Sequence, residues 1–332
     1  MSDAVAMFQL LDVEKVYRID RSGWLRFGLG AGQRLMALDR IRLTVGAGDS
    51  VALVGESGSG KSTLLRVLVG LTASSNGRAL FRGREIDRLS SAERKQFQRD
   101  VAMIYQDARG SLNPRLRVVD LIAEPMREHR LCQPSEVQDR VIALLTRVGM
   151  PADAAERYPS QLSGGQVRRV AIARALASEP KVIVADEAVS GLDVSTQAQL
   201  LNLLRGLQRE MGLTLLFITH DLAVASYLCR RIAVMYLGRI VESGPTRAVL
   251  RQPAHPYTRA LLEASPRFFE PIAGTLSGEI PSPIDLPSGC RFAGRCRLAG
   301  PECLEREPEL QAFGADRQVA CWRPETDQAP CP

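Results

Sequence analysis

The feature that most constrains this chain is a glycine-rich segment at residues 55–63, which follows the apolar run VALV and opens the helical run STLLRVLVGL. Glycines let consecutive backbone N–H groups point inward at phosphate oxygens, and the start of a helix adds further N–H donors. Between a strand and a helix, the pattern G-x-x-x-x-G-K-[ST] predicts a cradle for nucleotide phosphates, which we call the phosphate loop. Its residues are Gly55, Glu56, Ser57, Gly58, Ser59, Gly60, Lys61, Ser62 and Thr63.

Side chains of the phosphate loop and of a later segment offer groups for a metal ion and for water. Within the loop, Lys61 can bridge the terminal phosphates and the Ser62 hydroxyl can ligate Mg²⁺. Asp186 follows the β-branched run KVIVA, at the carboxyl end of a predicted buried strand, where α/β sheets place ligands. Its neighbour Glu187 is a candidate general base for an attacking water. Adjacent carboxylates can instead cap a helix, but a phosphate loop in the same chain favours the catalytic interpretation.

Periodicity along the rest of the chain alternates between strand and helix, which predicts an α/β sheet covered on both faces. Strands are expected at Phe8–Tyr17, Ile41–Val45, Ser50–Val54, Lys181–Ala185 and Thr214–Thr219, and helices at Val137–Val148, Gln166–Leu176 and Val194–Met211. The interruption Arg18–Arg34, which contains Trp24 and Phe27, is expected to be a long exposed hairpin loop. Contact of that loop with a nucleotide, a partner or lipid headgroups is the alternative.

The bulk composition excludes several classes of protein. No apolar stretch approaches the ~18 to 20 residues that cross a bilayer, and the N-terminus lacks the basic start and cleavage site of a secretory signal. Seven cysteines in a chain without an export signal do not indicate a disulfide framework. The net charge of +6 is a mild basic bias, and a solvated surface explains it better than a nucleic-acid site.

A serine-glycine-glycine turn at the start of a predicted helix is a second candidate anion site. The run LSGGQ followed by VRRVAIARAL closely resembles the signature of ATP-binding-cassette (ABC) ATPases. The residues of this signature are Ser163, Gly164, Gly165 and Gln166. The resemblance implies a P-loop NTPase of the ABC-ATPase fold, with an antiparallel β subdomain, a central mostly parallel sheet, a helical signature subdomain and a Cys-rich C-terminal extension.

Three further segments, which contain Gln106, residues 190–193 and His220, arrive in the order that this family shows, and Tyr17 adds a less specific match. Gln106, in AMIYQDARGSLNPR, matches the glutamine loop, which senses Mg²⁺ and lies against the membrane subunit. His220, in LLFITHDL, matches the switch histidine that contacts the γ-phosphate, and Tyr17 resembles the aromatic residue that stacks on adenine. The loop that crosses the dimer interface matches Ser190, Gly191, Leu192 and Asp193. Ala188 and Gly191 depart from the residues usual in the family, but neither change removes a reacting group, so we expect an active ATPase.

The resemblance also implies how the chain is divided and how it works. It predicts an ABC ATPase domain at residues 1–262, with a helical subdomain at about 107–178, and a C-terminal extension at residues 263–332. Two cassettes would dimerise head to tail, each ATP held by one phosphate loop and by the partner's signature. Mg²⁺ would be bound through Ser62, Gln106 and Asp186, while Glu187 and His220 would act on the water and the γ-phosphate.

Three segments outside the ATP motifs resemble one branch of the family. YQDARGSLNPR, HPYTRALLEASP and IPSPIDLPSGCRFAGRC look like the oligopeptide, dipeptide and nickel importers. This branch implies a second homologous ATPase, giving a heterodimer, together with two transmembrane permease subunits and an extracytoplasmic solute-binding protein. The chain would be a peripheral protein on the cytoplasmic face of the cell membrane, and peptide import is the expected function. A cassette subunit of a soluble phosphonate-cleaving complex, or an importer of nickel or another small solute, is the alternative.

Four cysteines near the C-terminus have the spacing C-x5-C-x6-C-x17-C, and they are Cys290, Cys296, Cys303 and Cys321. Structural zinc sites usually contain tight C-x2–4-C pairs, which this group lacks. Wider spacing with four thiolates is compatible with an iron–sulfur cluster, and the resemblance to the importer branch points to [4Fe–4S]. Zinc, or thiols without any ligand, are the alternatives that remain open.

Overall fold

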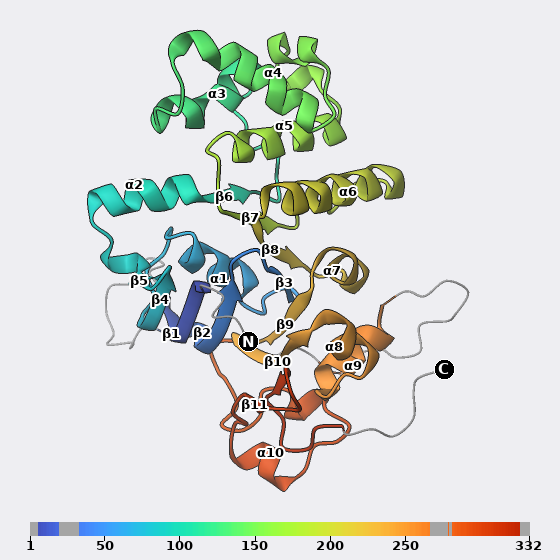
Figure 1. Cartoon of the computed structure of the whole chain (residues 1–332). Helices are drawn as coiled ribbons and strands as arrows, with labels where there is room; N and C mark the ends of the chain where they lie inside the picture. Colours follow the sequence, from blue (N-terminus) through green and yellow to red (C-terminus); the bar gives the residue numbers. More distant parts are fainter. Residues whose placement is uncertain (1–5, 20–32, 266–277, 279–280, 326–332) are drawn as a thin grey trace, which may run out of the picture. The chain divides into compact units, whose positions relative to one another are not determined.

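The computed structural model describes residues 6–19, 33–265, 278 and 281–325, and it divides into two compact units. One, which we call the signature unit, contains Gly46–Ser50 and Arg88–Ile218. The other, which we call the phosphate-loop unit, contains Phe8–Val45, Val51–Asp87 and Thr219–Pro332. Each unit is described below by itself, with the labels of Figure 1.

Parallel strands form the sheet of the signature unit. In this sheet Val101 pairs with Val182 and Asp186 with Ile218. The strands carry β-branched and other apolar side chains that are almost all buried, as expected of a parallel sheet covered on both faces. They are β6 (Val101–Ile104), β7 (Val182–Asp186) and β8 (Thr214–Thr219).

The helices of the signature unit begin at side chains that cap them. Ser90 and Ser163 each form a reciprocal capping box with the residue three positions later, and Asp193 accepts a hydrogen bond from the Thr196 N–H. Helices α3, α4 and α5 contact one another and form a group of their own (Figure 1). The helices are α2 (Ser91–Asp100), α3 (Val118–Glu128), α4 (Val137–Arg147), α5 (Gly164–Leu176) and α6 (Val194–Met211).

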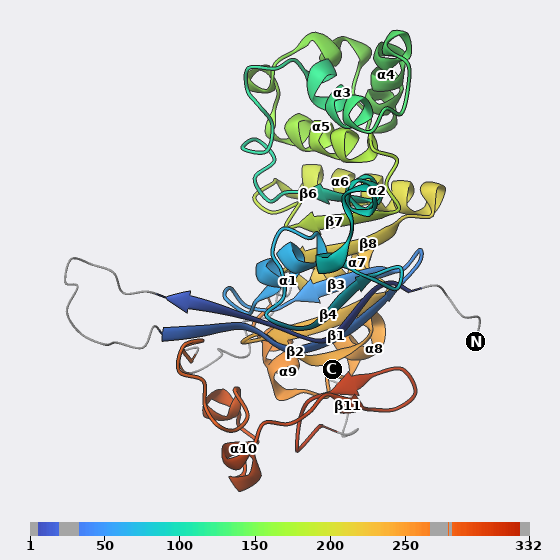
Figure 2. The same ribbon diagram turned by 90° about the vertical axis from the view of Figure 1, so that its left-hand side faces the viewer.

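The phosphate-loop unit contains an antiparallel sheet in the order β2-β1-β4-β5. Figure 2 shows the two long strands β1 and β2 lying side by side. Phe8 pairs with Phe81 across β1 and β4, and the two rings are in contact. The strands are β1 (Ala6–Ile19), β2 (Gln33–Gly46), β4 (Asn76–Phe81) and β5 (Arg84–Glu85).

A second group of strands in this unit joins the centre of the chain to its C-terminal region. β3 is parallel to β9, β10 is antiparallel to β9, and β12 and β11 continue the sheet beyond β10. The strands are β3 (Ser50–Val54), β9 (Arg231–Tyr236), β10 (Arg239–Pro245), β11 (Gln311–Ala312) and β12 (Gln318–Val319). The helices are α1 (Lys61–Leu68), α7 (Leu222–Leu228), α8 (Thr246–Arg251), α9 (Pro256–Glu263) and α10 (Pro301–Glu305).

The elements expected from periodicity are present, and the longer ones extend beyond their expected ends. The predicted strand Phe8–Tyr17 lies within β1, and Ile41–Val45 is only the second half of β2. Arg18 and Arg34, at the ends of the predicted loop, belong to these strands, and residues 20–32 lie outside the described residues. The pairing of Glu242 with Val319, which adds the C-terminal region to the sheet, was not expected from the sequence.

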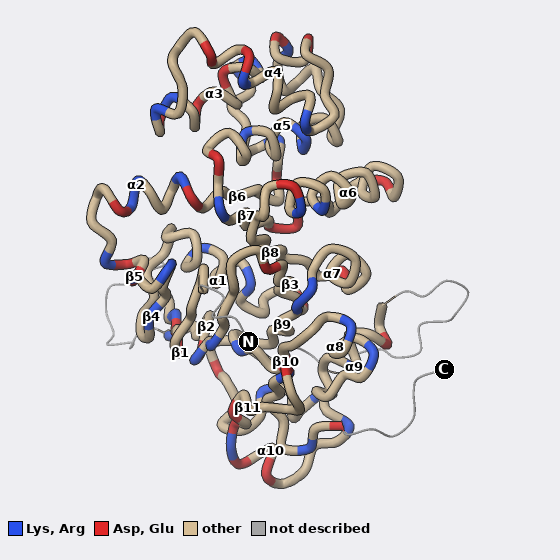
Figure 3. The backbone as a smooth tube through the Cα atoms, viewed as in Figure 1, with Lys and Arg blue, Asp and Glu red and all other residues tan. Residues whose placement is uncertain are grey.

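Charged residues of both signs are interspersed along the described chain. Figure 3 shows Lys and Arg next to Asp and Glu along α2 and around α10. Most of the ion pairs are exposed, so they contribute little to stability.

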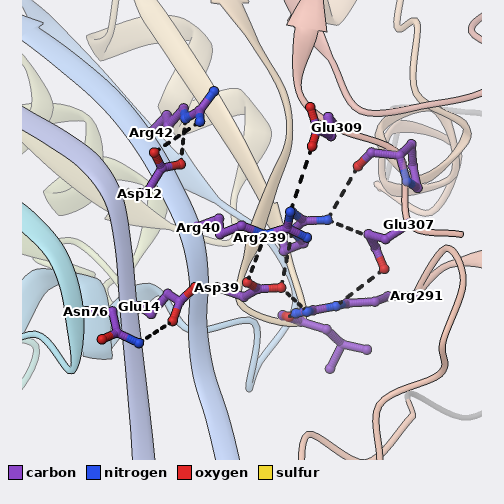
Figure 4. A network of polar contacts seen from close by, with 12 residues as sticks. Asp12, Glu14, Asp39, Arg40, Arg42, Asn76, Arg239, Arg291, Glu307 and Glu309 are labelled. Carbon is purple, nitrogen blue, oxygen red and sulfur yellow. Dashed lines mark hydrogen bonds and ion pairs between the residues drawn. The ribbon is translucent and has the colours of Figure 1, made fainter.

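A buried ionic cluster fastens the C-terminal region (residues 281–325) to the rest of the phosphate-loop unit (Figure 4). Asp39 of β2 accepts a hydrogen bond from Arg291 and lies 3.5 Å from the Arg239 Nε. Glu307 lies 3.4 Å from Arg239 and 3.6 Å from Arg291. The four side chains are between 8% and 18% exposed, so solvent screens their interactions only weakly. Burial raises the pKa of Glu307, and the two arginines oppose that rise.

We predict that Asp39→Ala lowers the free energy of unfolding by about 3 kcal/mol, because it leaves two buried guanidinium groups with too little negative charge. The matched control is Arg42→Ala in the exposed Asp12–Arg42 pair, also drawn in Figure 4, whose side chains are 46% and 65% exposed. That control should cost less than about 1 kcal/mol. Urea unfolding of both variants measures the difference. Equal losses would show that the buried cluster is no more important than a surface pair.

Candidate nucleotide site

The phosphate loop lies between the fully buried strand β3 and helix α1. Gly60 is the N-cap of α1 and has a φ of 101°, which disfavours any residue with a side chain. A Cβ atom at this position would lie 2.6 Å from the carbonyl oxygen of Ala37. Glycine is therefore required here both for the curl of the loop and for the close approach of β2.

Lys61 holds its ammonium group inside the curl of the loop. Its Nζ donates to the carbonyl oxygens of Gly55 and Glu56, both at 2.7 Å, and to the Ser59 Oγ at 3.2 Å. The residue is 7% exposed. This places a positive charge beside the loop's backbone N–H groups, the arrangement that a polyphosphate needs.

The turn between β9 and β10 and the start of α9 support the loop from outside. The Gly238 N–H donates to the Ser59 carbonyl at 2.9 Å, and the Gly238 carbonyl accepts from the Asp39 N–H at 2.9 Å. The Tyr257 hydroxyl accepts from the Glu56 N–H at 2.9 Å. These contacts connect a loop near residue 60 to segments about 180 to 200 positions later, which no local sequence pattern predicts.

In the signature unit, the fold brings together two residues that the sequence analysis had identified separately. The Gln106 side-chain amide donates to the Glu187 Oε2 at 2.9 Å. Glu187 has a φ of 43°, unusual for a residue other than glycine, and its N–H donates to the Ile218 carbonyl at 3.0 Å. Asp186 directly precedes it as the last residue of β7. Asp186, the candidate metal ligand, and Glu187, the candidate general base, therefore lie together at the end of β7.

The signature residues lie at the exposed start of α5. Ser163 Oγ accepts from the Gln166 N–H at 3.3 Å, and the Gln166 Oε1 accepts from the Ser163 N–H at 3.0 Å. Ser163 and Gly164 are exposed, while Gly165 and Gln166 are partly buried. The capping box presents the first turn of α5 to solvent as an anion site.

Arg168, which the sequence analysis did not single out, connects the signature helix to the loop after β7. Its guanidinium group donates to the carbonyl oxygens of Ala188 and Ser190. Burial lowers the pKa of Arg168. The only sequence signal for this role is the arginine pair that follows LSGGQ. Arg168 thus holds the backbone that runs from Glu187 toward the predicted dimer-interface loop.

That loop, residues 190–193, also has a structural function of its own. Gly191 has a φ of 69°, and the Asp193 carboxylate caps α6. The hydrogen bond from the Thr196 N–H lowers the pKa of Asp193. Leu192 is partly buried, and the following Val194 is 84% exposed. The loop is therefore held by the Asp193 cap at its end, and the exposed apolar side chain of Val194 follows it at the start of α6.

His220 and Tyr17 belong to the phosphate-loop unit. His220 is exposed and follows the last residue of β8, and its neighbour Asp221 caps α7 through the N–H groups of Ala223 and Val224. Tyr17 is partly buried on β1, with the Lys15 Nζ 5.2 Å from its ring centre. The structure thus describes the predicted site residues in two sets, one in each unit.

Comparison with known proteins assigns the family. A family model described as ABC transporter matches residues 38–190, and one described as oligopeptide/dipeptide transporter, C-terminal region, matches residues 241–303. A protein of Sinorhizobium fredii named probable peptide ABC transporter ATP-binding protein y4tS is 45% identical over 97% of this chain and 90% of its own length. The chain belongs to the ABC transporter ATPases.

Other relatives agree with this assignment. The oligopeptide transport ATP-binding protein OppF of Salmonella typhimurium is 46% identical to this ATPase, over 83% of this chain and 85% of its own length. Among solved structures, the ATP-binding cassette MJ0796, in a dimeric post-hydrolysis state bound to ADP and phosphate, is 30% identical. It covers 73% of this chain and 99% of its own, with a TM-score of 0.63.

These similarities confirm the expected ABC-ATPase fold and the expected ATP-hydrolysing activity of this ATPase. The individual residue roles and the domain boundary at residue 262 stay predictions. Among the described residues, no helix of the ATPase is both long enough and apolar enough to span a bilayer.

The cysteine group of this ATPase is drawn together by the fold. Cys290, Cys296, Cys303 and Cys321 line one cavity, together with His255 and Trp322 among others. The Cys290 N–H donates to the Cys303 carbonyl at 2.7 Å. Burial raises the pKa of Cys290 to about 12 and that of Cys321 to about 11. The cavity holds about 10 Å³, and the described residues include no group of three or more His, Cys, Asp or Glu with the geometry of a metal site.

Proposed function

We propose that this ATPase is the motor subunit of an ABC importer for peptides. The observation that carries the proposal is the presence, in one chain, of an ABC transporter match and of a match to the C-terminal region of oligopeptide/dipeptide transporters. The named function of the relatives, peptide or oligopeptide transport, supports the same substrate class. The chain itself would bind ATP and not the solute, so its partners would determine which solute is transported.

The proposed assembly contains two cassettes and a membrane pore. The exposed signature residues Ser163 and Gly164 support a head-to-tail pair, in which the first turn of α5 faces the nucleotide of the other subunit. We take the second cassette to be a homologous but different ATPase, and the pore to be two permease subunits served by a solute-binding protein. The ATPase would then be a peripheral protein on the cytoplasmic face of the cell membrane.

In the proposed mechanism, the phosphate loop and Lys61 bind the triphosphate, and Tyr17 stacks on the adenine. Ser62, Gln106 and Asp186 would hold Mg²⁺, which neutralises charge that develops during phosphoryl transfer. Glu187 would polarise the attacking water, and His220 would orient it toward the γ-phosphate.

The hydrogen bond from Gln106 to the Glu187 Oε2 supports this division of roles. It restrains the carboxylate that must be aimed at the water, and it connects the general base to the loop that would lie against the permease. Hydrolysis and the conformation of the permease would thereby influence the same side chain, and closure of the dimer would move the permeases by a shift of populations.

We predict that Glu187→Gln retains ATP binding but lowers the hydrolysis rate by at least about 100-fold, because an amide cannot accept the proton from water. The variant should accumulate as a closed, ATP-bound dimer. Single-turnover hydrolysis and size-exclusion chromatography with ATP measure both effects. Wild-type turnover would exclude Glu187 as the general base.

Co-purification tests the transporter assignment. Tagged protein is extracted from native membranes with a gentle detergent, and the proteins that accompany it are identified by mass spectrometry. We expect two multispanning proteins and a second cassette ATPase. A set of soluble enzymes without a membrane partner would contradict the proposal and favour a cassette that serves an enzyme complex, whereas nickel-specific partners would contradict the peptide substrate alone.

We further propose that the four gathered cysteines bind an iron–sulfur cluster that fastens the C-terminal region. The donor set supports it, because four thiols that share one cavity suit [4Fe–4S], and zinc is the alternative occupant. A bound metal would hold these cysteines as thiolates, because ligation requires the deprotonated sulfur. The small size of the C-terminal region, which leaves it without a sizeable core, supports a structural role rather than a redox one.

We predict that Cys296→Ser, purified without oxygen, loses the visible absorption of a cluster and melts at a lower temperature. Cys132→Ser is the matched control, because Cys132 lies in the signature unit outside the group, and it should keep the wild-type spectrum. Metal analysis that finds zinc in the wild type would replace iron–sulfur by zinc. Neither metal in the wild type would contradict the proposal.

A further inference from the structure

Residues 290–296, with the sequence Cys-Arg-Phe-Ala-Gly-Arg-Cys, reach the phosphate loop directly. We call this segment the cysteine loop. Its Arg295 donates from Nη1 to the Glu56 Oε2 at 2.8 Å and from Nη2 to the Glu56 Oε1 at 3.1 Å. Two parallel hydrogen bonds of this kind form a strong and strongly oriented contact. The partners are 239 residues apart in the sequence and lie in the same unit.

Three groups of Glu56, its carboxylate, its N–H and its carbonyl, each form a hydrogen bond. Its carboxylate receives Arg295, its N–H donates to the Tyr257 hydroxyl at 2.9 Å, and its carbonyl accepts from the Lys61 Nζ at 2.7 Å. The last of these contacts involves the lysine that faces the phosphates. A change at the Glu56 side chain is therefore transmitted to the backbone of the phosphate loop.

An aromatic group fixes Arg295 in place. Its side chain is only 4% exposed, and the guanidinium carbon lies 5.9 Å from the ring centre of Tyr236 and 6.0 Å from that of Phe292. Tyr236, Tyr257 and Phe292 also pack on one another, with ring centres 4.6 to 5.4 Å apart. Phe292 itself belongs to the cysteine loop, so folding of that loop orders the arginine.

The same loop is linked to the phosphate loop a second time, indirectly, through Arg291. Arg291 donates to the carbonyl oxygen of Leu237, and the neighbouring Gly238 N–H donates to the Ser59 carbonyl at 2.9 Å. The two arginines of the cysteine loop therefore contact the phosphate loop directly at Glu56 and indirectly at Ser59.

Charge gives the Arg295 contact a function beyond attachment. Glu56 places a carboxylate in the loop that would bind a polyanion, and an uncompensated like charge in that loop would oppose phosphate binding. The Arg295 side chain is 4% exposed and that of Glu56 is 22% exposed, so solvent screens their interaction only weakly.

We propose that Arg295 is a positioning residue for ATP. It neutralises and orients Glu56, so that the affinity of the phosphate loop for nucleotide depends on the fold of the cysteine loop. This goes beyond the peptide-import proposal and does not depend on which metal, if any, the cysteines bind.

The test measures the affinity of the full-length chain for methylanthraniloyl-ATP, a fluorescent nucleotide, in the presence of Mg²⁺. Arg295→Ala should raise the dissociation constant about tenfold, on the scale of one lost charge-assisted hydrogen bond. The double variant Arg295→Ala with Glu56→Gln should bind more tightly than Arg295→Ala alone, because the uncompensated carboxylate is gone. A loss that came only from detachment of the cysteine loop would not be rescued by that second change.

Two further variants separate positioning from attachment. Asp316→Asn breaks another ion pair between the C-terminal region and β9, the 2.7 Å contact with Arg231, and should leave nucleotide affinity unchanged. Arg295→Lys keeps the charge but not the paired hydrogen bonds, and its nucleotide affinity should lie between those of the wild type and Arg295→Ala. It replaces Arg295→Ala in the test if that variant does not fold. Melting temperatures without nucleotide identify unfolded variants.

An unchanged dissociation constant in folded Arg295→Ala would overturn the proposal, as would failure of Glu56→Gln to restore affinity in the double variant. An equal loss of affinity in Asp316→Asn would also overturn it, since the effect would then come from attachment of the C-terminal region. None of these outcomes depends on the transported solute, so they are separate from the co-purification result.

Discussion

The structure depends on one constraint, which is that a short backbone loop must hold many N–H donors and a lysine ammonium around a polyanion. Such a loop has few hydrogen bonds of its own to stabilise it, because several of its donors must stay available for the ligand. The surrounding fold therefore has to hold it. Ala37 approaches Gly60 too closely for a side chain, the Gly238 turn bonds to Ser59, and Tyr257 bonds to Glu56.

The C-terminal region takes part in this support instead of forming an independent appendage. It is short and contains few large apolar side chains, so it cannot build a sizeable core of its own. Three features other than a core hold it in the phosphate-loop unit. β12 extends the sheet at β10, Arg291 joins the buried cluster around Asp39, and four cysteines gather around one cavity.

Strands, helices and the ATP motifs were largely predictable, while the contacts between distant segments were not. The buried runs VALV and KVIVA and the caps at Ser163 and Asp193 are local patterns, and local patterns are set by backbone geometry and nearby hydrogen bonds. Nothing local indicates that Gln106 bonds to Glu187, or that Arg168 holds the carbonyl oxygens after β7. The sequence analysis also did not predict strands β4, β6, β9 and β10. The two short strands near the C-terminus were missed as well, because two residues are too few for any periodicity.

The sequence by itself determined that this chain has a phosphate loop, a signature helix and a C-terminal region with four cysteines, because each of these depends on residue types at fixed spacing. Only the tertiary structure decided that Arg295, next to one of those cysteines, would meet a glutamate of the phosphate loop. The physical reason is that an ion pair between residues 239 positions apart depends on how strands and loops pack, and side-chain identity alone does not specify that packing.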